Sequence, residues 1–466
     1  MNPPTGILLF KAMFEKVVGV DVTAIVDEGL GNSSYVVDLG DGSALVVDPE
    51  RDPRPYLAEL GRRGLRARFV AETHLHADFV SGGRELAVGD VELLAPADSE
   101  LAYAHRPLRD EEEVDLGGLT LRVVATPGHT PEHISYLLLD GSEPVALFSG
   151  GTLMTGGVAR TDLLSADQTV PLARAAYRSV RRRLFTLPDD LLVYPTHGAG
   201  SFCSVGDGAE RTTSIGREKA ANPLFAGDPD EDAFVERLVA GYGTYPPYFL
   251  ELRDVNRNGP VLIGPEPAPL AELSPAQVEA AVTGGAEVVD VRSVTDFAAG
   301  HVPRSISNPW RAQFATWLGW LIPRQTPLIF VTDDTVHRED LVWAALKVGF
   351  ENVEGVLVGG QETWRGSGRP LSRMTVAEGR DAVDGRVVLD VRQASEYASG
   401  HLPDAVHAEL GSLMGSAGDV SDQPVLVHCG HGERAATAAS LLFRDGHEDV
   451  TVFQGGPGEL GDLVTE

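Results

Sequence analysis

Short apolar runs follow one another closely through the first 150 residues of the chain. Gly, Asp and Asn separate several of them, a pattern typical of β-strands joined by turns. The runs are residues 22–26, 34–37, 44–47, 69–71, 91–95, 119–125, 134–139 and 146–148. Several lie too close together for an intervening helix, so part of their sheet must be antiparallel. This half of the chain predicts a β-rich sandwich flanked by helices.

The last 200 residues contain an internal repeat. An Asp-Val-Arg triplet at 290–292 and a Gly-His pair at 300–301 return at 390–392 and 400–401, an offset of 100 residues. A period this long is typical of two independent domains and not of a solenoid.

Each copy of the repeat alternates apolar runs with helical segments. In the second copy the runs at 387–389, 424–427 and 450–453 are suited to buried parallel strands, and a helix is expected at 435–443. Strands separated by helices predict a parallel sheet covered on both faces.

Two stretches rich in Pro and Gly, residues 258–270 and 366–373, are the expected linkers. A chain of 466 residues is too long for one hydrophobic core. We therefore expect three domains, at 1–257, 271–366 and 374–466.

The composition excludes some classes of protein. Hydrophobic residues make up 43% and charged residues 23%, as in soluble globular proteins, and no apolar run approaches the length of a membrane span. With 38 basic against 68 acidic residues, the net charge of -30 disfavours binding to nucleic acid or to anionic membranes. The first 16 residues lack the features of a secretory signal, and two cysteines are too few for a disulfide framework. A cytoplasmic location is expected.

Candidate metal ligands cluster after the run at 69–71. His74, His76 and Asp78 lie in one short loop, where imidazole groups at this spacing suit zinc or iron. Further ligands must come from distant loops, and His129 and His197 are candidates. The predicted metal ligands are His74, His76 and His129, with Asp78 and His197 nearby.

This half resembles the metallo-β-lactamase superfamily, and most closely the persulfide dioxygenases that are often fused to rhodanese domains. The resemblance runs, in the family's order, through residues 31–35, 47–49, 73–79, 126–133, 160–162 and 214–223. It implies an αββα sandwich that holds one Fe(II) or Zn(II) ion. It also implies that Arg160 and Asp162 lie beside a thiol-substrate pocket, although an internal ion pair is an equal alternative.

Two departures from the family pattern affect the metal site. Phe79 stands where the family has a histidine, and Gly151 stands where it has an aspartate that ligates metal. Neither residue can be a ligand, so a second metal site is not expected. Three alternatives remain for this domain: a metal-free scaffold or binding module, a mononuclear site with hydrolytic chemistry, or persulfide dioxygenation despite Gly151.

The candidate nucleophile is Cys429, in a glycine-containing loop between a predicted strand and a predicted helix. Backbone N–H groups, the positive end of the helix dipole and Arg434 all favour thiolate over thiol there. The same surroundings would stabilise a persulfide on the sulfur. Residues expected to bind the substrate are Gly430, His431, Gly432, Glu433 and Arg434, together with Arg160 in the first domain.

This loop and the repeated motifs upstream resemble the rhodanese sulfurtransferases. Gly430 departs from the family, which often has a basic residue there, and this favours a low-molecular-weight persulfide over thiosulfate as the donor. Only four residues separate Cys429 from Arg434, whereas a phosphatase loop of this type needs five. An inert buried cysteine is the remaining alternative.

The first copy has lost the nucleophile, because Asp333 stands at the cysteine position. A carboxylate cannot become a persulfide, so this copy is expected to serve in spacing, docking or homodimer contact. Cys203, close after His197, is either a packing residue or a second thiol near the metal site.

These features predict a multidomain α/β protein: an αββα sandwich followed by two rhodanese-like domains with parallel sheets. The expected function is sulfane-sulfur metabolism, with transfer of sulfur through a Cys429 persulfide. Low-molecular-weight thiols and persulfides are the expected partners. The alternatives are an active iron-dependent persulfide dioxygenase fused to rhodanese domains, a zinc hydrolase of thioesters or lactones, and a non-catalytic persulfide carrier or sensor.

Overall fold

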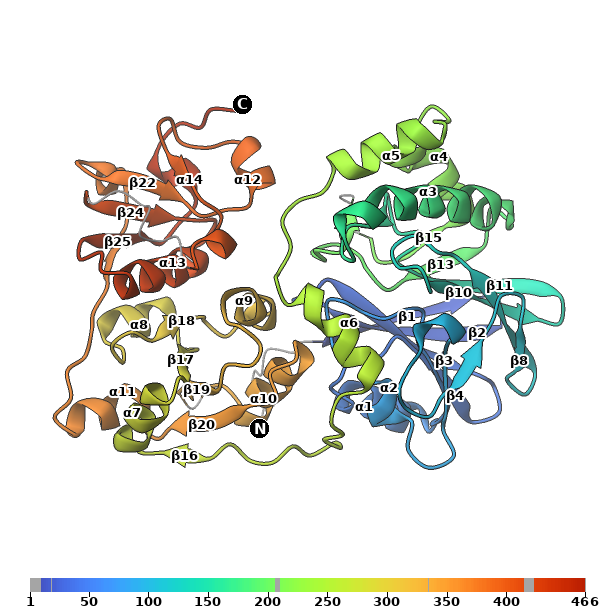
Figure 1. The fold of residues 1–466 in the computed structure, drawn as a ribbon, viewed down its shortest axis with the longest axis horizontal. Helices are drawn as coiled ribbons and strands as arrows, with labels where there is room; N and C mark the ends of the chain where they lie inside the picture. Colours follow the sequence, from blue (N-terminus) through green and yellow to red (C-terminus); the bar gives the residue numbers. More distant parts are fainter. Residues whose placement is uncertain (1–9, 18, 206–209, 334, 415–422, 466) are drawn as a thin grey trace. The chain divides into compact units, whose positions relative to one another are not determined.

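The structure is a computed structural model that describes residues 10–17, 19–205, 210–333, 335–414 and 423–465. Contacts divide the chain into two compact units (Figure 1). The first runs to Pro267 and includes Leu346–Gly349, and the second comprises Ala268–Ala345 and Phe350–Glu466. Residues 1–9 of the N-terminal stretch, which lacks the features of a secretory signal, and Asp334 of the first-copy loop lie outside the described residues. Among the described helices none has the length and apolar character needed to cross a membrane.

A seven-stranded sheet forms one layer of the first unit. Its first four strands are antiparallel and the remainder run parallel, as the close spacing of the apolar runs predicted. In sheet order the strands are β1 (Phe10–Val17), β2 (Val20–Asp27), β3 (Asn32–Asp38), β4 (Ser43–Val47), β5 (Arg66–Ala71), β6 (Glu92–Pro96) and β7 (Arg106–Leu108).

A six-stranded sheet forms the second layer. In sheet order its strands are β15 (Thr213–Ser214), β13 (Leu192–Pro195), β11 (Glu143–Gly150), β10 (Ile134–Asp140), β9 (Leu119–Ala125) and β8 (Glu113–Asp115). The two sheets share one hydrophobic core, in which the Tyr35 ring lies 5.5 Å from that of Phe148 and 5.3 Å from that of Tyr194. A short ribbon, β12 (Val158–Ala159) with β14 (Ser204–Val205), lies outside the two sheets.

Helices cover the outer face of each sheet. Tyr56 and Leu60 of α1 (Arg54–Arg63) and Leu86 of α2 (Gly83–Leu86) pack on the first sheet. The helices α3 (Ala166–Arg182), α4 (Ile215–Ala221) and α5 (Glu231–Ala240) cover the second sheet, and α6 (Phe249–Asn258) ends the unit's helices. The predicted αββα sandwich is confirmed.

The two copies of the repeat have the same topology, a five-stranded parallel sheet with helices on both faces. The first contains β16 (Glu272–Leu273), α7 (Pro275–Thr283), β17 (Glu287–Asp290), α8 (Val294–Ala299), β18 (Ile306–Ser307), α9 (Phe314–Leu321), β19 (Leu328–Val331), α10 (Arg338–Lys347), β20 (Val353–Leu357) and α11 (Gly360–Gly366). The second contains β21 (Thr375–Ala377), β22 (Val387–Asp390), α12 (Ala394–Ala398), β23 (Val406–His407), β24 (Val425–His428), α13 (Glu433–Arg444), β25 (Val450–Phe453) and α14 (Pro457–Leu460). The sheet orders, β16-β20-β19-β17-β18 and β21-β25-β24-β22-β23, match strand for strand.

The repeated sequence motif forms a buried brace in each copy. In the second, Asp390 at the end of β22 accepts hydrogen bonds from Arg392 at 2.9 and 2.6 Å, and Arg392 also donates to the Gly400 carbonyl at 2.8 Å. The first copy makes the same contacts through Asp290 and Arg292. The brace ties the strand to the loop that follows the next helix, so it maintains the fold in both copies.

The two copies pack against each other through α13. The Ser307 amide on β18 donates to Ser440 Oγ at 3.1 Å, and Arg444 forms a bidentate pair with Glu287 at 2.9 and 2.8 Å. These contacts involve the second half of α13, the helix that begins at the Cys429 loop.

Candidate functional site

Cys429 lies between β24 and α13, and its side chain is buried. The Gly432 amide donates a hydrogen bond to Cys429 Sγ at 3.1 Å. Gly432 adopts a left-handed backbone (φ 108°), and a Cβ there would lie 3.2 Å from Gln454 Cα. A glycine is therefore needed for the amide to point at the sulfur.

Arg434, in the first turn of α13, supplies a cation beside the sulfur. Its guanidinium donates to both carboxylate oxygens of Glu396 at 2.6 and 2.8 Å and also interacts with the Cys429 thiol. Burial lowers the pKa of Arg434, but Glu396 and Cys429 outweigh burial and raise it. The guanidinium is thus held charged and oriented by Glu396.

A buried histidine stands directly before the nucleophile. His428 is fully buried, and its Nε2 lies 3.5 Å from Asp390 Oδ2. Burial lowers the pKa of His428, although Asp390 opposes this shift. His428 therefore packs as a neutral ring under the loop.

The other predicted substrate-binding residues surround Cys429 at the surface. His431 is exposed, and Gly430 and Glu433 are partly exposed. A Cβ at Gly430 would lie 3.6 Å from an Arg434 Nη2, so the loop has space at this position. The predicted set thus occupies one loop and the start of one helix.

The corresponding loop of the first copy has a different arrangement. Asp333 Oδ1 accepts a hydrogen bond from the Thr335 amide at 2.8 Å, and Arg338 pairs with Glu272 at 2.7 Å. The loop lines an open cavity of about 510 Å³, to which Arg292 and Val336 also contribute. Asp333 stands where the second copy has Cys429, and the silence of this copy stays a prediction.

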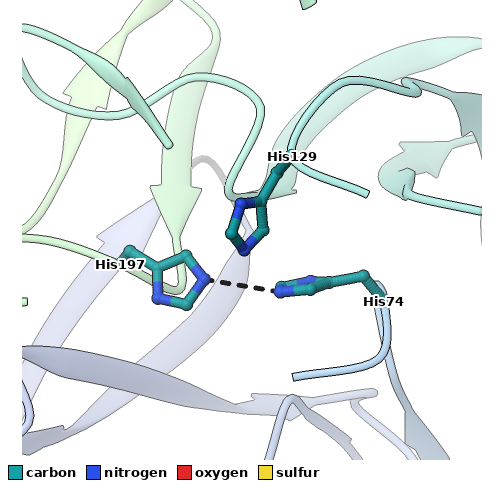
Figure 2. Close-up of side chains that lie close together, drawn as sticks. All are labelled: His74, His129 and His197. Atoms are coloured by element: carbon teal, nitrogen blue, oxygen red, sulfur yellow. Dashed lines mark hydrogen bonds between the residues drawn. The ribbon is translucent and has the colours of Figure 1, made fainter. Parts of the chain in front are cut away.

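Three histidines converge between the two sheets of the first unit (Figure 2). His74 follows β5, His129 lies between β9 and β10, and His197 follows β13. All three are buried, and their ligand atoms lie within 4.8 Å of one another. His74 Nε2 is 3.4 Å from His197 Nε2, and His129 Nε2 is buried without a hydrogen-bond partner among the described residues.

These three residues fit one metal ion. The other ring nitrogen is already held in all three: His129 Nδ1 lies 2.6 Å from the Arg160 carbonyl, His74 Nδ1 lies 2.8 Å from Thr73 Oγ1, and His197 Nδ1 lies 3.1 Å from Asn32 Oδ1. Such contacts orient a ring so that its free nitrogen can bind metal. Burial lowers the pKa of His129 to about 3, so this imidazole is neutral, as a metal ligand must be. The cluster can therefore hold a metal ion.

His76 is engaged by two carboxylates. Its Nε2 lies 3.1 Å from Glu72 Oε2 and 3.3 Å from Asp48 Oδ1. Burial lowers the pKa of His76, but Asp48 and Glu72 outweigh it and raise the pKa to about 10. The structure thus groups the predicted ligands His74 and His129 with His197. It also groups His76 with His74 and Asp48, and with Asp78 and His197.

The two departures from the family pattern have clear structural positions. The Phe79 ring is fully buried and stacks on His76, with centroids 4.2 Å apart. At Gly151, a Cβ would lie 2.9 Å from Ala159 Cβ, 3.1 Å from His129 and 3.2 Å from His197. The imidazoles therefore occupy the space into which a side chain at 151 would extend.

Arg160 is held by groups of its own unit. Its guanidinium donates to Asp162 at 2.7 and 2.8 Å and to the Gly243 carbonyl at 2.8 Å, and it lies 4.4 Å from the Tyr245 ring centroid. These contacts correspond to the internal ion pair, and a role for Arg160 in binding substrate stays a prediction. Cys203 is fully buried, and burial, followed by Asp78, raises the pKa of its thiol.

Known families match both units. Residues 27–197 match the metallo-beta-lactamase superfamily, and residues 274–367 and 375–458 each match the rhodanese-like domain. The chain carries a metallo-β-lactamase domain followed by two rhodanese-like domains. The resemblances and the fold class predicted from the sequence are confirmed.

Relatives of the metallo-β-lactamase domain differ in the activities that their names state. The mitochondrial persulfide dioxygenase ETHE1 of Homo sapiens is 32% identical over 184 residues, which cover 39% of this chain and 65% of the relative. The hydroxyacylglutathione hydrolase of Hahella chejuensis is 34% identical over 169 residues, covering 36% and 62%. The chain thus spans less than two thirds of the length of either relative.

A solved structure supports the fold over a larger share of the chain. The crystal structure of a metallo-beta-lactamase from Staphylococcus aureus subsp. aureus COL has a TM-score of 0.63 and 26% identity, and it covers 72% of this chain and 98% of that chain. These similarities are consistent with a role in sulfur metabolism.

Sequence reasoning missed the groups that support the two sites. Glu72 beside His76 and His428 under the rhodanese loop carry no motif of their own. The Glu396–Arg434 pair had a partial signal, since Arg434 belongs to the Cys429 loop and Glu396, of opposite charge, lies between the repeated Asp-Val-Arg triplet and the Gly-His pair.

Proposed function

We propose that the second rhodanese-like domain transfers sulfane sulfur between low-molecular-weight thiols through a persulfide on Cys429. The observation that carries this proposal is the hydrogen bond from the Gly432 amide to Cys429 Sγ, made at the start of α13 and beside Arg434. All three features stabilise negative charge on sulfur, in the thiolate and in the persulfide.

The transfer proceeds in two displacements. Cys429 thiolate attacks the terminal sulfur of a donor persulfide, the donor S–S bond breaks, and the donor leaves as a thiolate that takes up a proton. An acceptor thiolate then attacks the terminal sulfur of the Cys429 persulfide, and Cys429 leaves as thiolate with the bonding electron pair. One persulfide is consumed and one is formed, so no external oxidant or reductant is needed.

The proposal is tested by loading and turnover. Purified protein is incubated with glutathione persulfide, and the peptide containing Cys429 is examined by mass spectrometry for one added sulfur atom. Excess acceptor thiol is then supplied and product persulfide is counted per protein. Many turnovers support an enzyme, a single turnover favours a persulfide carrier, and failure of Cys429 to load refutes the proposal.

We propose further that the metallo-β-lactamase domain holds one ion, Fe(II) or Zn(II), on His74, His129 and His197. The set is supported by the ligand atoms of these three residues, which lie within 4.8 Å of one another, and by His129 Nε2, which has no hydrogen-bond partner among the described residues; His76 Nε2 instead faces Asp48 and Glu72. Such an ion would supply Lewis-acid chemistry to a bound substrate or water. Sulfur oxidation is disfavoured, because the oxygenase pattern of two histidines and one carboxylate lacks its carboxylate at Gly151.

Metal content and oxygen uptake test this second proposal on the same samples. Protein as isolated and protein reconstituted with Fe(II) are compared for bound metal and for oxygen consumption with glutathione persulfide. The His129→Ala variant should bind less metal, whereas the His76→Ala variant should retain it. Rapid oxygen uptake by the iron-loaded protein would show that the domain is a persulfide dioxygenase despite Gly151.

A further inference from the structure

A carboxylate joins the two loops that carry His74 and His129. Glu132 lies three residues after His129, in the loop between β9 and β10, and its side chain is buried. Its Oε1 accepts a hydrogen bond at 3.1 Å from the amide of Leu75, the residue directly after His74. One side chain therefore bridges loops that belong to different sheets of the sandwich.

Arg253, on α6, holds the other oxygen of this carboxylate. Its Nη2 donates to Glu132 Oε2 at 3.3 Å, and both side chains are buried. Arg253 Nη1 is buried without a hydrogen-bond partner among the described residues. Because a buried charge without its partner is costly, the pair keeps the carboxylate in one position.

The backbone on the other side of His74 is anchored separately. The amide and the hydroxyl of Thr73 donate to the two carboxylate oxygens of Asp48, each at 2.7 Å, and the hydroxyl oxygen lies 2.8 Å from His74 Nδ1. These contacts fix His74 on its own sheet. The Ile134 amide also donates to the Thr73 carbonyl at 3.0 Å, so the two loops stay connected even without Glu132.

We infer that Glu132 is a positioning residue for the metal ion: it sets the separation of His74 and His129 by tying the backbone beside one to the loop of the other. The inference rests on the proposed metal set and adds the group that fixes its geometry. The two imidazole rings lie 4.9 Å apart between centroids. Metal–ligand distances vary by only about 0.2 Å, so a small displacement of either loop weakens binding.

The first measurement is the Zn(II) affinity of the full-length protein, by competition with a chromophoric chelator. In Glu132→Ala the Leu75 amide loses its acceptor, and we expect the Kd to rise at least about tenfold, as for other groups that orient metal ligands. Glu132→Gln keeps an oxygen that can accept from Leu75, so its Kd should rise less than about threefold. Equal losses in both variants would show that the carboxylate acts only through its charge, which overturns the inference.

Glu59→Ala is the matched control. Glu59 is a buried carboxylate of the same unit that pairs with Arg62 of α1, outside the histidine loops. Its Kd should equal that of the wild type, and a loss as large as in Glu132→Ala would overturn the inference by showing general destabilisation. The double variant Glu132→Ala with Arg253→Met leaves neither charge of the pair buried alone. It should bind Zn(II) as weakly as Glu132→Ala, and it replaces that variant if the single change prevents folding.

Hydrogen exchange of the metal-free protein separates this inference from the proposed metal set. Peptides that cover Leu75 should exchange at least about fivefold faster in Glu132→Ala than in the wild type, because the amide has lost its hydrogen bond. Unchanged exchange overturns the inference. If His129→Ala retains Zn(II) as tightly as the wild type, the proposed metal set is refuted instead, and the exchange result still decides whether Glu132 holds the loop.

Discussion

The two rhodanese-like domains differ at the loop after the central strand, although they share the sheet order and the buried Asp–Arg brace. In the second copy, Gly432 directs an amide at Cys429 and Glu396 orients Arg434 toward the sulfur. In the first copy the matching arginine, Arg338, pairs with Glu272 instead. The comparison separates residues that maintain the fold, which both copies keep, from residues that perform the chemistry, which only one copy keeps.

Removing the nucleophile should have the largest effect. Cys429→Ala leaves no sulfur to accept the transferred atom, and we expect sulfur transfer to fall by at least about a thousandfold. Asp333→Ala, the matched change in the first copy, should leave transfer unchanged. Both are measured by persulfide formation on an acceptor thiol.

A cysteine alone should not give the first copy the ability to transfer sulfur. A double variant, Asp333→Cys with Cys429→Ala, should stay inactive, since Val336 stands in place of Gly432 and a β-branched residue disfavours the left-handed backbone. Transfer by this variant would show that the rest of the loop does not matter.

Replacement of Gly432 should have the next largest effect. A Cβ would meet the backbone of Gln454 at 3.2 Å and strain a left-handed residue, so Gly432→Ala should displace the amide that bonds Cys429. We expect a loss of about a hundredfold in kcat/KM, in line with removing one charge-stabilising donor. Val336→Ala in the first copy is the control, and transfer assays together with circular dichroism separate a catalytic loss from unfolding.

The shared brace should behave alike in both copies. Arg292→Ala and Arg392→Ala each leave a buried carboxylate without its partner, and we expect each to destabilise its own domain by about 3 kcal/mol. Hydrogen exchange of peptides from β17 and β22 measures each domain separately. A large difference between the two variants would contradict a purely structural role for the motif.

The smallest expected effect concerns acid sensitivity. Burial lowers the pKa of His428, with Asp390 opposing, so below about pH 6.5 the unfolded chain binds more protons at this residue than the folded protein. The stability associated with neutral His428 is therefore lost as the pH falls. His428→Thr introduces the residue that the first copy has at the matching position, Thr332. Between about pH 7 and about pH 5, the hydrogen-exchange protection of β24 should fall less in this variant than in the wild type. The difference should be at most about 1.4 kcal/mol per pH unit.

Local sequence patterns predicted the fold well where strands are continuous and apolar. The predicted runs 119–125 and 450–453 coincide with β9 and β25. The sandwich and the repeated domains were predictable for the same reason, since burial on a sheet face leaves a regular pattern. The Cys429 loop was predictable because its residues are adjacent in the chain.

Groups brought together from distant segments were less predictable. The set of His74, His76 and His129 as metal ligands stays a prediction, and the contacts of His76 with Asp48 and Glu72 depend on how β4 and β5 pair. The contacts of Ser307 with Ser440 and of Glu287 with Arg444 arise from the packing of one copy on the other, which no local pattern encodes.

The packing of the two copies also has a spectroscopic consequence. Trp320 of α9 lies so close to Gly411 of the second copy that a Cβ there would fall 2.0 Å from its Nε1, and its ring stacks on Trp317 with centroids 5.1 Å apart. Trp320 is buried, and a buried indole emits at shorter wavelengths than one in water. The chain thereby contains an intrinsic fluorescent reporter, which would shift to the red whenever the silent copy separates from its sulfur-carrying neighbour.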